Sequence, residues 1–110
     1  MNKLLITSCL LLALSGAAFA EEHAAAALEH DNAAVTHGKA GHAPVLVEHA
    51  QAALEHAKKG VEVATGESKT HLNAAVKSLE QSIEHGKMGH ADKATQPAEE
   101  AVEHIKAGNK

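Results

Sequence analysis

The sequence repeats itself with a period of 48 residues. Residues 23–62 align on residues 71–110 without a gap, and 15 of the 40 aligned pairs are identical. Both copies contain the motif His-Gly-Lys-x-Gly-His, which begins at His37 in the first copy and at His85 in the second. Such self-similarity indicates that one supersecondary unit occurs twice. We therefore expect two related repeat units, residues 23–70 and 71–110.

Each repeat unit has the pattern of a helical hairpin. Apolar residues at helical spacing predict four helices, at about 22–37, 44–59, 69–85, and from 93 or 96 to 107. The residues that mark their ends are the expected stops Gly38, Gly60, Gly86 and Gly108, Pro44 in a first turn, and Ser68 or Thr70 as a cap. Short turns make the partners of each hairpin antiparallel, with residues 60–67 as the link between hairpins. The expected fold is all-α, an up-and-down four-helix bundle of two repeated antiparallel hairpins.

The first twenty residues have the pattern of a cleaved signal peptide. Lys3 supplies a positive start, residues 4–14 an apolar stretch, and Ala18-Phe19-Ala20 a cleavage site of small residues. The apolar stretch is short for a membrane span. We expect cleavage after Ala20 and a periplasmic or secreted single domain of residues 21–110, without a membrane anchor. A weaker alternative is lipid anchoring at Cys9, because residues 6–9 loosely resemble a lipoprotein cleavage box.

The composition of the mature chain removes several classes of function. Its 90 residues include 9 Lys, no Arg and 14 acidic residues, for a formal net charge of −5, and no Cys, Phe, Tyr or Trp. Disulfides, thiolate metal sites and a thiol nucleophile are thereby excluded. Nucleic acid is not an expected partner, because it requires cationic contacts and stacking surfaces. Only 14 of the 90 residues are Leu, Ile or Val, so we expect a thin, Ala-filled core and marginal stability.

Histidines flank the apolar seams at intervals of seven residues in the first repeat and of fourteen in the second. The ten of them are His23, His30 and His37 in the first helix, His42, His49 and His56 at the second, His71 and His85 in the third, and His90 and His104 at the fourth. In the third helix Leu72, Val76, Leu79 and Ile83 define the seam by spacings of 4, 3 and 4, and the histidines lie beside it. Seven residues rise about 10.5 Å along a helix, so neighbouring histidines of one helix cannot share an ion.

Opposed histidines of a hairpin fall on common levels. In an antiparallel pair, residues whose numbers add to a constant face each other, which pairs His23 with His56, His30 with His49, His37 with His42, His71 with His104, and His85 with His90. Ser78 and Pro97 take the place of a middle pair in the second hairpin. With helix axes about 8 to 10 Å apart and metal–nitrogen bonds of about 2.0 Å, two such imidazoles can meet at one ion. We predict all ten histidines as metal ligands.

The ligand type restricts the choice of ion. Imidazole with carboxylate and water suits Cu(II), Ni(II) and Zn(II), and Cu(II) binds most tightly in the Irving–Williams order. A Glu precedes six of the ten histidines and is expected to point mainly to solvent. We therefore expect Cu(II) as the preferred cargo, with Ni(II) or Zn(II) also bound.

Three other readings of the histidines are open. A His-based pH-responsive protein fits imidazoles that titrate near pH 6.5, and a structural helical protein without metal fits the bundle alone. A bis-His haem bundle is disfavoured, because an Ala core without aromatic residues leaves little room for a porphyrin. Gly-x-Ser-x-Gly and His-Glu-x-x-His do not occur, so we expect neither catalytic residues nor enzyme activity.

The chain resembles the small metal-binding proteins of the bacterial periplasm in three features. These are the signal peptide, the His-Gly-Lys-x-Gly-His turns, and the segments Glu55-His56-Ala57-Lys58 and Glu103-His104-Ile105-Lys106. The resemblance covers essentially the whole mature chain. It implies a monomeric helical bundle that takes up several divalent ions, copper especially, for storage, buffering or tolerance. The positions that match the repeating pattern are His37, His42, His49, His56, His85, His90 and His104. Pro97 departs from it, and the fourth helix is expected to start late or bend there.

Overall fold

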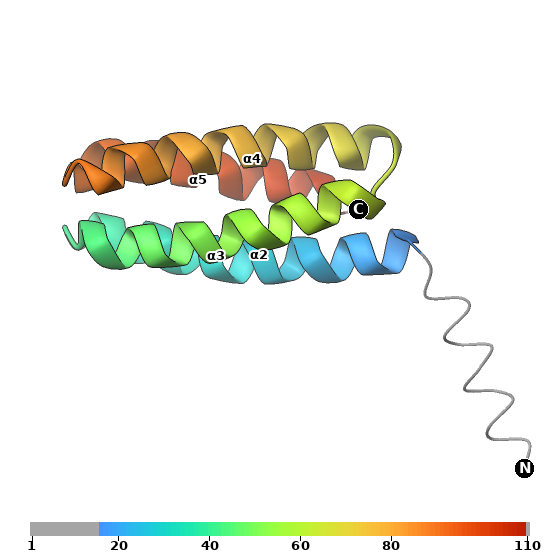
Figure 1. Ribbon diagram of the computed structural model, residues 1–110, viewed down its shortest axis with the longest axis horizontal. Helices are drawn as coiled ribbons and strands as arrows, with labels where there is room; N and C mark the ends of the chain where they lie inside the picture. Colours follow the sequence, from blue (N-terminus) through green and yellow to red (C-terminus); the bar gives the residue numbers. More distant parts are fainter. Residues whose placement is uncertain (1–15, 110) are drawn as a thin grey trace, which may run out of the picture.

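Four antiparallel helices form the bundle in the computed structural model, which describes residues 16–109. They are α2 (Gly16–Lys39), α3 (Ala43–Val63), α4 (Gly66–Lys87) and α5 (Ala91–Gly108). α2 and α3 form one hairpin, α4 and α5 form the other, and the two hairpins lie side by side along their length (Figure 1). The expected all-α bundle of two hairpins is confirmed. The apolar stretch at 4–14 and Cys9 lie outside the described residues.

The bundle is closed by contacts between the hairpins. α3 packs on α4, and α2 packs on α5. The core between them is built mainly of alanine, with Leu46, Leu72, Leu79 and Ile105 as its largest fully buried apolar side chains. Each of these large side chains contributes about 1.5 to 3 kcal/mol on burial. Because most core side chains are only a methyl group, the helices approach closely and little apolar volume holds them together.

Close packing also explains several glycines. A Cβ atom on Gly86 would lie 2.5 Å from Cγ2 of Val47, and one on Gly60 would lie 3.1 Å from Cδ1 of Leu72. α2 and α4 end one residue beyond the expected stops Gly38 and Gly86, whereas the expectation that Gly60 ends α3 is wrong, because α3 continues to Val63. At Gly38 and Gly86 the neighbouring helix leaves no room for a Cβ atom, and at Gly60 the space is tight. Gly108 ends α5 as expected.

The two turns within the hairpins have the same geometry. Gly41 and Gly89 adopt φ angles of 82° and 81°, in the region that favours glycine. The His42 amide donates to the His37 carbonyl at 2.8 Å, and the His90 amide donates to the His85 carbonyl at 3.1 Å. The repeated His-Gly-Lys-x-Gly-His motif is therefore a turn that brings two histidines together at the end of each hairpin.

The helices are longer than the sequence indicates. The link is shorter than the expected 60–67 and consists of Ala64, which follows α3, and Thr65, which precedes α4. Thr65 occupies the N-cap, so Ser68 and Thr70 do not cap α4. The Ser68 hydroxyl instead donates to the carbonyl of Gly108, which ties the start of α4 to the end of α5. Pro44 lies in the first turn of α3, as predicted.

α5 runs through Pro97 without a late start. It begins at Ala91, so the expected start at 93 or 96 is wrong. Proline removes one helical hydrogen bond, here to the Lys93 carbonyl, and costs about 3 kcal/mol in a helix interior. Burial of Pro97 and its neighbours offsets this cost, and Ser82 on α4 donates a hydrogen bond of 2.7 Å to the Ala94 carbonyl. The packing of α5 on α4 thus overrides the local preference of proline.

None of the helices within residues 16–109 combines the length and the apolar character that a membrane crossing requires. α2 continues upstream of the expected cleavage site after Ala20, beginning at Gly16. Cleavage at that site stays a prediction.

Candidate metal-binding site

All six histidines of the first hairpin form one continuous row. We call it the imidazole ladder: His23, His30 and His37 on α2, and His42, His49 and His56 on α3. Three of its contacts join histidines that the sequence pairs on common levels, which we call rungs. The ring centroids are 5.6 Å apart for His23 and His56, 6.1 Å for His30 and His49, and 5.9 Å for His37 and His42. The structure thus places the two rings of each of these three pairs near each other, and their pairing through a metal ion stays a prediction.

Two further contacts cross between levels, and the sequence reasoning missed them. The centroids of His30 and His56 are 5.7 Å apart, and those of His37 and His49 are 5.5 Å apart. We call these contacts diagonals. Their ring planes are nearly parallel, at 8° and 5°, whereas the rungs are tilted by 31° to 36°. Rungs and diagonals alternate, so each inner imidazole touches two rings of the opposite helix.

The rung of His23 and His56 also brings two ring nitrogens close together. Nδ1 of His23 lies 3.4 Å from Nδ1 of His56, a distance at which one neutral ring donates and the other accepts. Burial, with the positive charges of His23, His30 and Lys59, lowers the pKa of His56, against a smaller opposing effect of Glu55. The hairpin therefore favours the neutral form of this ring, which is the form that binds a metal.

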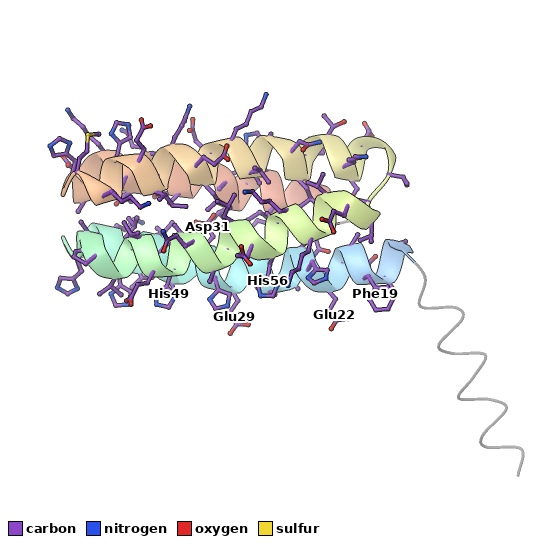
Figure 2. The ribbon with its side chains drawn as sticks, viewed as in Figure 1. Phe19, Glu22, Glu29, Asp31, His49 and His56 are labelled. Carbon is purple, nitrogen blue, oxygen red and sulfur yellow. The ribbon has the colours of Figure 1, made fainter. Side chains whose placement is uncertain are left out.

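The ladder lies at the surface of the bundle. Five of its rings are half-buried and His42 is exposed. The glutamates that precede histidines are exposed, in agreement with the sequence: Glu22, Glu29, Glu48, Glu55, Glu84 and Glu103. In Figure 2, His49 and His56 lie on the same outer edge of the bundle as Glu22 and Glu29. An ion at this edge is open to water and within the field of these carboxylates.

The ring separations suit two imidazoles at one ion. Metal–nitrogen bonds are about 2.0 Å long, and each nitrogen lies a further bond length from its ring centre, so two rings on one ion can have centroids up to about 6 Å apart. Among residues 16–109, no three His, Cys, Asp or Glu side chains converge on one point. An ion on the ladder would thus have two protein ligands, with water in its remaining positions.

The second hairpin differs from the first. Its histidines, His71, His85, His90 and His104, make none of the imidazole contacts that the structure records within residues 16–109. Ser78 and Pro97, which replace the middle pair, are buried instead of lying at the surface. The two rungs predicted here are therefore not formed as ring contacts, and the ligand role of these four histidines stays a prediction.

His85 has its own surroundings. Its Nδ1 atom is buried and has no hydrogen-bond partner in the described part of the chain. The ring borders an open groove beside α4 and α5, whose other walls include Lys93, Glu99, Glu100 and Glu103. The groove collects carboxylates beside one imidazole, in contrast to the imidazole pairs of the first hairpin.

A buried carboxyl lies behind the ladder. Asp31 is fully buried, and neither of its carboxylate oxygens has a hydrogen-bond partner among residues 16–109. Burial raises the pKa of this carboxyl from 3.8 to about 8. Its label in Figure 2 falls between the two hairpins, away from the edge with His49 and His56. The sequence reasoning overlooked Asp31, although the 48-residue alignment places it opposite Leu79, a core position.

The fold and the ladder together define a class of protein: a small helical bundle that presents paired imidazoles on its surface. The chain belongs to the family of small metal-binding proteins, whose family model matches residues 1–108. No curated protein matches the chain significantly. The resemblance inferred from the histidine motifs is thus confirmed, and the family name identifies metal binding as the activity.

Proposed function

We propose that this protein reversibly binds several divalent cations, Cu(II) most tightly and also Ni(II) and Zn(II), and buffers them in the periplasm. The observation that carries the proposal is the imidazole ladder, in which three histidine pairs predicted from the sequence lie with centroids 5.6 to 6.1 Å apart. Neutral imidazoles suit these cations, and the order of affinities follows from the intrinsic preference of nitrogen ligands.

The form of the ladder favours storage over catalysis. Two protein ligands for each ion, at a surface edge, hold the ion less tightly than a closed set of four ligands in a structural site. Water in the remaining positions lets another chelator replace the protein ligands. Such a site loads and releases its cargo with the free ion concentration, as a buffer requires.

Export is part of this proposal. Lys3, the apolar stretch at 4–14 and the Ala18-Phe19-Ala20 site support a cleaved signal peptide. An oxidising compartment favours Cu(II) over Cu(I). Mass spectrometry of the protein recovered from a periplasmic extract should give the mass of residues 21–110, and a lipid-modified Cys9 would contradict that.

The proposal is tested by calorimetric titration of residues 21–110 with Cu(II), Ni(II) and Zn(II) at pH 7.5 and at pH 5. Several ions should bind at pH 7.5 and few at pH 5, because metal binding requires neutral rings. The double variant His30→Ala/His49→Ala removes one rung and should remove about one ion. A helical protein that binds no ion at pH 7.5 would contradict the proposal and favour a structural role.

A pH-responsive function is the second candidate. It is favoured by the 3.4 Å contact between His23 and His56, together with the lowered pKa of His56. Rings so close repel each other when both are protonated. A protein that opens between pH 7.5 and pH 5 without binding metal at either pH would support this second function alone.

A further inference from the structure

The alternation of rungs and diagonals leaves no gap in the ladder. Starting from His23, the contacts lead to His56, His30, His49, His37 and His42 in turn, crossing between α2 and α3 at every step. The five centroid distances span only 5.5 to 6.1 Å. By distance alone, a diagonal is as good a pair of ligands as a rung.

We propose that rungs and diagonals are alternative sites for the same ions, so that a bound cation moves along the ladder by exchanging one imidazole at a time. This inference rests on the proposed function, since it concerns the same cations at the same ladder. In each step one metal–nitrogen bond forms to the next ring while the bond to the ring left behind breaks. Both rings stay neutral, and the charge of the ion does not change.

Each exchange moves the ion by only part of the distance between successive rungs. Histidines on one helix are seven residues apart, about 10.5 Å, so a direct move between successive rungs would require an ion to leave both ligands. A move from a rung to a diagonal keeps one ring and advances the ion by about half of that distance. The near-parallel planes of the diagonals differ from the tilted planes of the rungs, so the receiving ring turns by some tens of degrees about its side-chain bonds.

The number of ions that the ladder can hold then depends on which imidazoles are present. With all six rings, the only arrangement that uses every ring in a pair is the three rungs. Without the two end rings, His23 and His42, the remaining four rings still form two pairs, both diagonals. Without His37 and His56, the end rings lose their only neighbours, and one pair is left, His30 with His49.

This difference provides a matched pair of variants. His23→Ala/His42→Ala and His37→Ala/His56→Ala each remove one ring from α2 and one from α3, and each disrupts the same two rungs. If each rung were an isolated site, both variants would lose the same number of ions. If diagonals also bind, the variant that keeps the inner rings should lose one ion fewer.

The experiment measures bound Cu(II) by equilibrium dialysis at pH 7.5, for the protein of residues 21–110 and for both variants. Circular dichroism confirms helicity, and the corresponding Gln variants replace any Ala variant that unfolds. We expect His23→Ala/His42→Ala to lose about one equivalent of Cu(II) and His37→Ala/His56→Ala about two. A loss of two equivalents from both variants would overturn the shared ladder and leave the proposed function intact. A loss of only about one equivalent from His37→Ala/His56→Ala would mean that single rings hold ions, which also overturns the shared ladder.

An unchanged Cu(II) count in both variants would instead show that the ions bind elsewhere on the protein, and no binding by the parent protein would contradict the proposed function itself. A ladder whose diagonals bind no ion is thus distinguished from a protein that binds no metal.

Discussion

Nδ1 of His23 lies 3.4 Å from Nδ1 of His56, at the end of the ladder nearest the start of α2. At this distance one ring donates its N–H and the other accepts it, so the contact needs at least one neutral ring. When both rings are protonated, the acceptor is lost and two positive charges face each other. Protonation of these two rings therefore weakens the contact between α2 and α3.

His56 should titrate below the ordinary value of 6.5, because burial and the charges of His23, His30 and Lys59 lower its pKa. The folded protein then binds fewer protons than the unfolded chain just below pH 6.5, so the free energy of unfolding should decrease as the pH falls through this range. NMR titration of the His56 ring measures the pKa directly. The control His23→Gln removes one positive neighbour and should raise that pKa. A His56 ring that titrates at or above 6.5 in the metal-free protein would contradict the prediction.

Asp31 should destabilise the protein increasingly as the pH rises. Its pKa of about 8 in the fold against 3.8 in the unfolded chain means that the folded state holds a proton that the unfolded state has lost. The free energy of unfolding should therefore decrease between about pH 4 and pH 8, by several kcal/mol for a carboxyl as fully buried as this one. Asp31→Asn, which keeps the shape of the side chain, should remove this dependence.

Replacing Asp31 by the residue of the second repeat should stabilise the bundle. Asp31→Leu introduces the side chain that the aligned position 79 carries in the core, and removes an unpaired buried carboxyl. At pH 8 we expect a gain of at least about 1 kcal/mol, which raises Tm by about 4 to 8 °C in a domain of this size. Thermal unfolding followed by circular dichroism measures it. A lower Tm than that of the parent protein would mean that the extra volume does not fit.

Gly38→Ala should destabilise the bundle although alanine favours a helix. A Cβ atom at this position would overlap Oγ1 of Thr95 and lie 2.7 Å from Cδ1 of Leu46. Overpacking of this kind costs about 1 to 3 kcal/mol, measured by urea unfolding. The double variant Gly38→Ala/Thr95→Ala removes one of the overlapping atoms and should recover part of the loss. Equal losses in the single and double variants would show that Thr95 is not the obstacle.

The two hairpins should contribute unequally to metal binding. His23→Ala/His56→Ala removes a rung that the structure forms, whereas His71→Ala/His104→Ala removes a predicted pair without a recorded ring contact. We expect the first variant to lose about one equivalent of Cu(II) and the second to lose less. Equilibrium dialysis at pH 7.5 compares them. Equal losses would show that the ion itself draws the rings of the second hairpin together.

The rungs could be predicted from the sequence because they depend on two simple periods. A seven-residue interval keeps each histidine on the same flank of its helix, and an antiparallel hairpin reverses the order on its partner. The diagonals could not be predicted, because they depend on the height of one helix against the other. α2 ends at Lys39 and α3 begins at Ala43, so the turn is centred about one and a half residues later than the rungs imply. His49 and His56 consequently each contact two rings of α2, whereas His42, at the end of the ladder, contacts one.

The helix ends, the course of α5 and the burial of Asp31 depend on packing between helices. Gly38 and Gly86 have the pattern of helix stops, because a glycine before a turn is typical of one, but each helix continues for one more residue and the glycine lies where the neighbouring helix leaves no room for a side chain. Pro97 favours a late start of α5, but the burial of α5 against its neighbours overrides this preference. Asp31 was overlooked because a single charged residue in a helix usually faces solvent. Each outcome depends on contacts between helices that are far apart in the sequence.

Because the histidines recur every seven residues, the number of imidazole pairs depends on the length of α2 and α3. Lengthening α2 and α3 by one heptad each, with a histidine at the matching position, would add one more pair of imidazoles and leave the cross-section of the bundle unchanged. A scaffold whose core is mostly alanine accepts such growth, since each added layer needs only small side chains. Under the proposed function, a longer chain of this architecture would hold more ions without a change of topology.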